Sequence, residues 1–251
     1  MSTPWRARRA STTTATTGGA KSTASSRPGC CDPTGTAVIR AVLFDLDGVL
    51  TDTERLHWGA YRQVLLELGV DMGIEEYRRW FIARGIGPEY TCRTYRLPVS
   101  PDELRALKAP VYRTLLEAGV RPMPGAREAL ARLAPTHELA IATNTARVEV
   151  DLIVAQLGLG GFLRTTITRE DYVRAKPAPD AYLAAAAALG LRPSECAVVE
   201  DTERGAAAAL AARIPVIAVP NDLTFDNDFT HCVRRLGSLD ELTAELLDRL
   251  G

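Results

Sequence analysis

The sequence is poor in cysteine, lysine and long apolar runs, and each shortage excludes a class of protein. The five cysteines show no CxxC spacing, which argues against a disulfide framework or a zinc site and indicates a reducing compartment. No apolar run approaches the length of a membrane-spanning helix. The net charge of -1 argues against a nucleic-acid-binding protein. We therefore expect a cytoplasmic protein with neither a membrane nor a nucleic acid as partner.

The shortage of lysine makes each lysine informative. Of the 30 basic residues only Lys21, Lys108 and Lys176 are lysine, and the rest are arginine. A lysine that occurs in a chain with so strong a preference for arginine is a candidate for a specific role. With 251 residues, 46% of them hydrophobic, the chain can build a substantial core in one or two domains.

The first 36 residues differ in composition from the rest of the chain. They are rich in Ser, Thr, Gly and Arg, contain Asp32 as their only acid, and show no hydrophobic periodicity. Residues 1–36 are therefore predicted to be a disordered leader. A transit peptide, which would place the protein in an organelle, is the alternative, although the amphipathic arginine face of such peptides is missing. A partner-binding arm is also left open.

The stretch after Thr51 has a helical pattern. Leu56, Ala60, Val64 and Leu68 recur four residues apart. Further helices are predicted near 74–84 and over 101–118, the second with Ser100 as its N-cap. Since no strand pattern occurs between residues 52 and 119, residues 53–120 are predicted to form an all-helical cap domain.

The remainder alternates between strands and helices, which is the pattern of a parallel sheet covered on both faces. We predict an α/β fold, a doubly wound (Rossmann-like) parallel sheet, built by residues 37–52 and 121–251 and interrupted by the helical cap. The predicted strands cover 38–44, 139–143, 165–168, 197–199 and 215–219, and the predicted helices lie near 126–133, 147–157, 179–189, 204–212 and 238–249.

The first strand ends in two aspartates. Asp45 and Asp47 are two residues apart, so on an extended chain they point to the same side. Two like charges at that spacing repel unless a cation or a proton lies between them. A polar strand end before a turn at Gly48 would explain this DxDG stretch equally well on its own.

Other strand ends carry polar groups as well, and ligands of doubly wound sheets bind outside the carboxyl ends of the strands. A cluster of carboxylates there calls for a hard cation, and Mg²⁺ is the natural choice. A metal beside a lysine and a hydroxyl makes a site for a phosphate monoester. The residues predicted to meet at this rim are Asp45, Asp47, Thr143, Asn144, Lys176, Glu200 and Asp201.

These motifs, in this order, resemble those of the haloacid dehalogenase superfamily. The stretches KPAPD (residues 176–180) and VVEDTERG (198–205) are most similar to its beta-phosphoglucomutase-like and sugar-phosphatase members. The match covers residues 38–250 and leaves out only the leader. It implies the helical-cap branch of the superfamily, an Mg²⁺ cofactor and a small phosphate ester as substrate.

The resemblance also implies residue roles. Asp45 would be the nucleophile that forms an aspartyl phosphate, and Asp47 the general acid and base. Asp45, the backbone carbonyl of Asp47, Glu200 and Asp201 would hold the metal. Thr143 and Asn144 would bind the phosphoryl oxygens, and Lys176 would neutralise charge. Because the dehalogenating members lack a second aspartate at the position of Asp47, dehalogenation is not expected.

Residues near the predicted cap bear on whether the protein is a phosphatase or a phosphomutase. His57 follows Asp47 by ten residues, as in the mutases and several sugar phosphatases, so it would contact the substrate or couple cap closure to Asp47; an ordinary hinge histidine is the alternative. Arg84 precedes Gly85 instead of following it, and Asn144 is not followed by the serine-lysine pair of the mutases. We therefore predict a monomeric phosphatase, with a hexose phosphomutase as runner-up and a non-catalytic binding member as a third hypothesis.

Overall fold

The computed structural model describes residues 38–250, so the predicted leader lies outside the described part of the chain. The described residues contain a six-stranded, all-parallel sheet with the strand order β3-β2-β1-β4-β5-β6. This confirms the predicted α/β, doubly wound fold. The strands are β1 (Ala41–Phe44), β2 (Glu138–Ala142), β3 (Thr165–Ile167), β4 (Cys196–Glu200), β5 (Val216–Ala218) and β6 (Arg234–Arg235).

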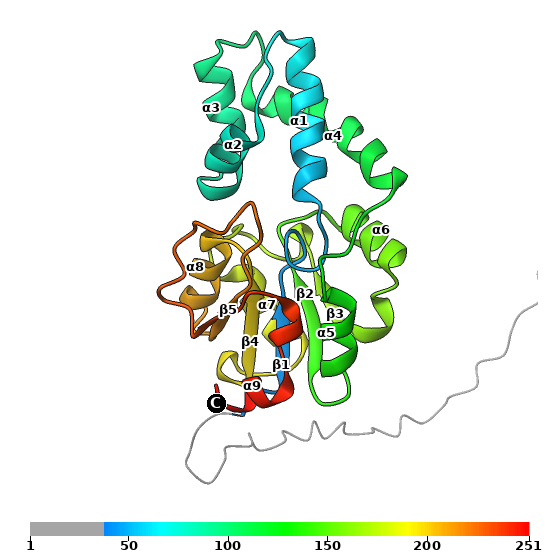
Figure 1. Ribbon diagram of the computed structural model, residues 1–251, viewed down its shortest axis with the longest axis vertical. Helices are drawn as coiled ribbons and strands as arrows, with labels where there is room; N and C mark the ends of the chain where they lie inside the picture. The colour runs from blue at the N-terminus through cyan, green and yellow to red at the C-terminus, as the bar shows by residue number, and fades with distance from the viewer. Residues whose placement is uncertain (1–37, 251) are drawn as a thin grey trace, which may run out of the picture. The chain divides into compact units, whose positions relative to one another are not determined.

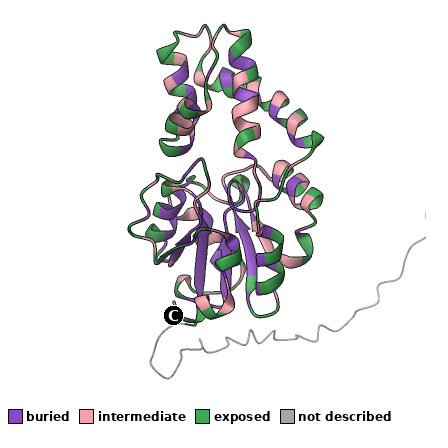
Figure 2. Ribbon diagram, viewed as in Figure 1, coloured by how far each residue is buried: buried purple, intermediate pink, exposed green. Residues whose placement is uncertain are grey.

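Alternation along β1 explains why helices cover both faces of the sheet. Val42 and Phe44 belong to one hydrophobic cluster, and Ala41 and Leu43 to another. Because successive strand residues point to opposite faces, each face of β1 contributes to its own core. Figure 2 shows the central strands as buried. The first cluster holds α5 (Ala126–Leu133), α6 (Arg147–Leu157) and α9 (Ala244–Asp248); the second holds α7 (Asp180–Ala188) and α8 (Glu203–Ala211).

The segment between β1 and α5 is helical, as predicted, and its helices group together (Figure 1). Helix α4 has the predicted bounds, and its N-cap Ser100 forms a reciprocal capping box with Glu103. The predicted 74–84 helix divides into α2 and a π-helical turn over Arg78–Ala83. The α-helices of this segment are α1 (Glu54–Glu67), α2 (Ile74–Tyr77), α3 (Gly87–Thr94) and α4 (Pro101–Ala118).

Two adjacent stretches of backbone join the helical segment to the sheet. The Asp52 N–H donates to the Arg121 carbonyl, and the Met123 N–H donates to the Leu50 carbonyl. These residues coincide with the predicted domain boundary. The described residues form a single compact unit, however, so the division into a core domain and a cap domain stays a prediction.

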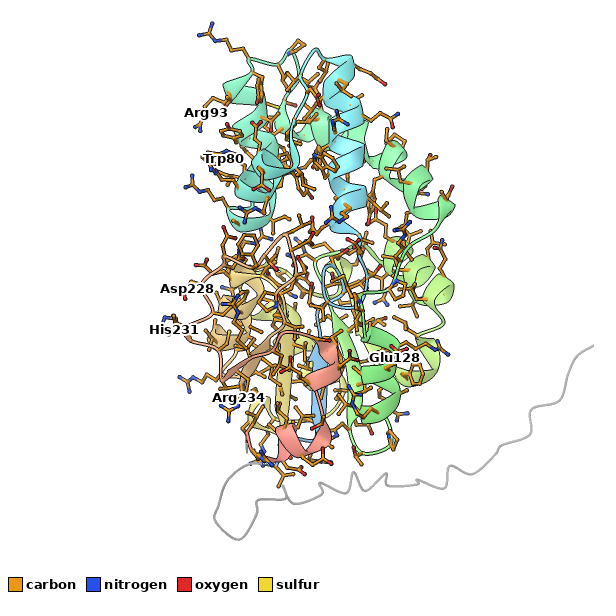
Figure 3. All side chains as sticks on the ribbon, viewed as in Figure 1. Trp80, Arg93, Glu128, Asp228, His231 and Arg234 are labelled. Carbon is orange, nitrogen blue, oxygen red and sulfur yellow. The ribbon has the colours of Figure 1, made fainter. Side chains whose placement is uncertain are left out.

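The C-terminal part differs from the predicted closing helix. In place of one helix over 238–249, a 3₁₀ turn covers Leu239–Glu241, and α9 begins at Ala244 with Thr243 as its N-cap. The short edge strand β6 was not predicted either; it consists of two exposed arginines, of which Figure 3 labels Arg234. Charged residues on a short edge strand discourage pairing with other chains. Within residues 38–250 no helix is both long and apolar enough to cross a membrane.

Candidate active site

The ammonium group of Lys176 lies at the centre of the site. Its Nζ atom donates to Asp45 Oδ1 at 2.6 Å, to Glu200 Oε1 at 2.8 Å and to the Tyr182 hydroxyl at 2.8 Å, which uses all three of its donors. Burial lowers the pKa of Lys176, but the two carboxylates outweigh burial and raise it overall. Lys176 is therefore a fixed positive charge beside the end of β1.

Asp45 follows β1 directly and is almost fully buried. Its backbone N–H donates to the Val199 carbonyl at 3.0 Å, which continues the β1–β4 ladder and directs the side chain to the carboxyl end of the sheet. Burial raises the pKa of Asp45 to about 8, although the Lys176 ammonium acts in the opposite direction. The charges of Glu200 and Asp47 raise this pKa further, so the carboxylates near Asp45 outnumber the one ammonium that contacts it.

Asp201, at the end of β4, has one carboxylate oxygen without a partner. Asn221 Nδ2 donates to Oδ2 of Asp201 at 2.8 Å, whereas Oδ1 is buried and accepts no hydrogen bond from any described residue. Burial and the neighbouring Glu200 and Asp45 raise the pKa of Asp201 well above its ordinary value. An unpaired buried acceptor of this kind suits a cation or a proton as its partner.

Three carboxylates come close enough to share a cation. Asp45, Glu200 and Asp201 each offer an oxygen atom within 4.8 Å of the others. Hard carboxylate oxygens, one of them without a partner, suit Mg²⁺, which binds through a few carboxylates and keeps several waters. The residues at this site therefore fit the divalent cation that the sequence predicts.

Glu200 is held in place by both of its oxygens. Oε1 accepts from Lys176 and, at 2.7 Å, from the Tyr182 hydroxyl, while Oε2 accepts from the backbone N–H groups of Asp201 and Thr202. The carboxylate lies against the first turn of α8, where a Cβ atom on Gly205 would be 1.6 Å from Oε1. A glycine is therefore required at this close approach.

Asp47 is surrounded by hydroxyl groups. Oδ2 accepts from Thr143 Oγ1 at 3.2 Å and from Thr145 Oγ1 at 2.5 Å, and Oδ1 accepts from the hydroxyl of Thr53. Thr53 is the N-cap residue of α1. The helical segment therefore contacts Asp47 directly, through a residue that the sequence did not single out.

Thr143 and Asn144 both lie at the rim, as predicted, but the carbonyl oxygen of Asn144 is already in use. Oδ1 accepts from the Tyr172 hydroxyl at 2.7 Å and from the Lys176 backbone N–H at 3.1 Å. Asn144 thus positions the loop that carries Lys176. The amide nitrogen of Asn144 takes part in neither of these contacts. Asn144 also lines the cavity above these residues.

A cavity of about 620 Å³ opens over these groups. One wall consists of the sheet residues just described, and another comes from the helical segment, with Glu54, His57 and Arg105 among its members. His57 lies on α1, and its Nδ1 atom is 2.5 Å from Lys108 Nζ. Every residue that the sequence placed at the site, apart from Asp201, lines this cavity, and Asp201 lies beneath it in the carboxylate cluster.

Several residues at the site were missed by sequence reasoning. Thr53, Lys108, Tyr182 and Asn221 contribute contacts, but each stands apart from the strand-end motifs. Among these four, Lys108 carried a usable signal, because lysine is so scarce in this chain. Thr145 could have been found as the second hydroxyl after β2.

Comparison with known proteins identifies relatives of several named activities. The chain is 30% identical to protein CbbY of Rhodobacter capsulatus over 84% of this chain and 99% of that protein. It is 28% identical to fructose-1-phosphate phosphatase YqaB of Escherichia coli, over 71% and 95% of the two chains. It is 29% identical to the beta-phosphoglucomutase of Mycobacterium bovis, over 71% and 80%.

The fold is found among solved structures as well. A crystal structure of a CbbY variant from Rhodobacter sphaeroides in complex with xylulose-(1,5)bisphosphate superposes with a TM-score of 0.69 and 28% identity, covering 82% of this chain and 96% of that one. The family model described as haloacid dehalogenase-like hydrolase matches residues 39–213. The predicted resemblance is therefore confirmed, and the chain belongs to the haloacid dehalogenase-like hydrolase family.

Proposed function

We propose that this hydrolase is an Mg²⁺-dependent phosphatase that acts on a small phosphorylated metabolite, a sugar or polyol phosphate, through an aspartyl phosphate at Asp45. The observation that carries the proposal is the contact of Lys176 Nζ with Asp45 Oδ1 at 2.6 Å, inside a buried group of three carboxylates. Lys176, together with a cation held by these carboxylates, would neutralise Asp45 and the incoming phosphoryl group.

In the first step Asp45 attacks phosphorus. A bond forms between a carboxylate oxygen of Asp45 and phosphorus, the bond from phosphorus to the substrate oxygen breaks, and Asp47 delivers a proton to the departing alcohol. In the second step Asp47 takes a proton from water, which attacks phosphorus and releases Asp45 and inorganic phosphate. Because the displacement is divided into two steps, Asp47 can donate a proton in the first step and accept one in the second.

The hydroxyl groups around Asp47 support this division of labour. Thr53, Thr143 and Thr145 donate to the Asp47 carboxylate, whereas Lys176 donates to Asp45. Two aspartates two residues apart thereby meet different partners. Asp45 faces a cation and acts as nucleophile, whereas Asp47 faces neutral donors and exchanges protons.

The metal would be held by Asp45, Asp201, Glu200 and the backbone carbonyl of Asp47. When bound, it supplies positive charge to the phosphoryl oxygens during transfer. The amide nitrogen of Asn144 and the hydroxyl of Thr143, which donates to Asp47 in this structure, would bind the same oxygens. The relatives support this substrate class, because their names include a fructose-1-phosphate phosphatase and their structures include a bisphosphate complex.

A panel of phosphorylated metabolites, assayed for phosphate release with and without EDTA, tests the proposal. We expect turnover of at least one sugar or polyol phosphate that EDTA abolishes and Mg²⁺ restores. Asp45→Asn is expected to be inactive and to accumulate no phosphoenzyme. Metal-independent turnover, or full activity of Asp45→Asn, would overturn the assignment.

A hexose phosphomutase is the second candidate, supported by the beta-phosphoglucomutase among the relatives and by the Arg105 and Arg204 side chains that line the cavity. These guanidinium groups could hold a second phosphate. The mutase hypothesis predicts that the protein converts glucose 1-phosphate to glucose 6-phosphate in the presence of a bisphosphate primer. It fails if that conversion is absent at enzyme concentrations that hydrolyse other esters.

A further inference from the structure

Asn221 lies just after β5 and links three parts of the site through one side-chain amide. Its Nδ2 atom donates to Asp201 Oδ2 at 2.8 Å and to the carbonyl of Gly48 at 3.1 Å. Its Oδ1 atom accepts from the Leu223 backbone N–H at 2.8 Å, which forms a local turn. The two ends of the amide therefore have separate tasks, one toward Asp201 and one toward its own loop.

These contacts leave Asp201 a single orientation. A carboxylate can rotate about its Cβ–Cγ bond, and such terminal torsions are soft. Here Oδ2 is held by Asn221 and lies against Gly48, where an added Cβ atom would be 2.2 Å away. Oδ1 is the oxygen that remains buried without a partner among the described residues, and Asp201 offers a carboxylate oxygen within 4.8 Å of oxygens of Asp45 and Glu200.

The loop that carries Asn221 is anchored to the helical segment. Leu223 is buried in the same hydrophobic cluster as Tyr61 and Tyr77. Farther along the loop, Asp226 pairs with Arg78 at 2.5 Å. Asn221 is thus attached to structure on both sides of the cavity, which limits how far its amide can move away from Asp201.

We propose that Asn221 is a positioning residue for the cation site: it orients Asp201 so that Oδ1 faces the metal. The inference rests on the proposed Mg²⁺-dependent function and adds a residue that the strand-end motifs do not contain. Partners that orient a metal ligand from behind typically contribute a factor of about 10 to 100 in metal affinity. Removing the Asn221 donor is expected to weaken Mg²⁺ binding by about that factor.

Two substitutions at Asn221 remove the donor to Asp201. Asn221→Leu keeps about the same side-chain size and adds no charge beside the cation site. Asn221→Ala also shortens the side chain. Asn227→Ala is the matched control, because Asn227 is in the same loop and its Oδ1 accepts from the Glu203 backbone N–H at 3.0 Å, away from Asp201.

The readout is the Mg²⁺ dissociation constant measured by calorimetry on the full chain without substrate, together with melting temperatures in EDTA. Both Asn221 variants should bind Mg²⁺ about 10 to 100 times more weakly than wild type, and Asn227→Ala should bind like wild type. In activity assays, the Mg²⁺ concentration that gives half-maximal activity should be higher for the Asn221 variants than for wild type. Their kcat at saturating Mg²⁺ should change much less than this concentration. A wild-type dissociation constant in either Asn221 variant overturns the inference, because the donor to Asp201 would then be dispensable.

Failure of the proposed function is distinguishable from failure of this inference. If wild type binds Mg²⁺ but hydrolyses no phosphate ester, the function is wrong and the dissociation constants still decide the role of Asn221. If wild type binds no Mg²⁺, the cation site and the role of Asn221 are both overturned. If Asn221→Ala melts before binding can be measured, Asn221→Leu decides the outcome alone.

Discussion

The Nζ atom of Lys108 lies 2.5 Å from Nδ1 of His57, and the imidazole stacks on the ring of Tyr112 with 3.9 Å between centroids. Burial and the Lys108 charge lower the pKa of His57 well below its ordinary value. Because His57 is then neutral and accepts at Nδ1, its proton resides on Nε2. The scarce lysine thus contacts the predicted cap histidine, which lines the cavity.

Lys108→Met should change how stability depends on pH. Burial lowers the pKa of Lys108 from 10.5 to about 8. Between these two pH values Lys108 is protonated in the unfolded chain and neutral in the native one. The free energy of unfolding of the wild type therefore increases as the pH rises through this range. Lys108→Met has no such group, so its free energy of unfolding does not show this increase. The stability of Lys108→Met relative to wild type should therefore be greatest below pH 8 and fall toward pH 10.5.

Urea denaturation at several pH values between 7 and 10 measures this difference. Leu107→Met, an exposed neighbour on the same helix, is the control and should show no pH-dependent difference from wild type. A constant difference between Lys108→Met and wild type across this range would contradict the lowered pKa.

Lys176→Met should abolish most activity without preventing Mg²⁺ binding. The substitution removes the ammonium that contacts Asp45 and leaves its carboxylate without that counter-charge. Loss of one such electrostatic contact costs about 100- to 1000-fold in kcat. Steady-state phosphate release measures the effect.

Arg174→Met is the matched control for Lys176→Met. Arg174 lies two residues earlier in the same loop, and its guanidinium pairs with Asp180 at the surface. Its activity should stay within about twofold of wild type, since exposed ion pairs contribute little. Equal losses of activity in the two variants would show that activity depends on the conformation of the loop and not on the Lys176 ammonium.

Asp47→Asn should separate the two chemical steps. Without a proton donor or acceptor at Asp47, turnover of an alkyl phosphate should fall by about 100- to 10,000-fold. A substrate with an acidic leaving group, such as p-nitrophenyl phosphate, needs no proton for the first step. Asp45 should then become phosphorylated and stay so, which intact-protein mass spectrometry after acid quenching detects.

Asp222→Asn serves as the control for Asp47→Asn, because Asp222 is exposed and pairs with Arg55. It should behave like wild type in both assays. Normal turnover of alkyl phosphates by Asp47→Asn would remove Asp47 from the mechanism.

Ser100→Ala should destabilise the helical segment. The Ser100 side chain accepts from the Glu103 N–H, and the Glu103 carboxylate accepts from the Ser100 N–H, at the start of α4. Loss of an N-cap side chain costs about 1 kcal/mol in the free energy of unfolding. Chemical denaturation measures the loss, and Ser194→Ala, at an exposed position, should change it by less than about 0.5 kcal/mol. Equal effects of the two substitutions would contradict a specific cap.

The fold was largely predictable because hydrophobic periodicity and local capping decide most of its elements. Ser100-Pro101 marks the start of α4, and the helix continues through Pro110 to Ala118 as predicted. Helix α3 was not predicted, since Gly87-Pro88 indicates a turn. Its proline lies in the first helical turn, where no N–H is needed, so a turn signal and a helix start look alike in sequence.

Most of the site residues that the sequence indicated lie at strand ends or in the loop before α7. Asp45 and Asp201 follow β1 and β4 directly, Lys176 lies in that loop, and the structure brings the three together. Lys108 and Asn221 reach the site by tertiary packing from a helix and a loop, and no local pattern specifies such an approach. Their roles depend on which neighbours the fold supplies.

The close approach of Gly205 to Glu200 links the identities of two positions. A side chain at 205 would occupy the space that the Glu200 carboxylate now fills. A larger residue at 205 should therefore be tolerated only with a shorter acid at 200, so that Gly205→Ala combined with Glu200→Asp is less harmful than Gly205→Ala alone. The two positions constitute one steric unit, and relatives that change one of them should be found to change the other.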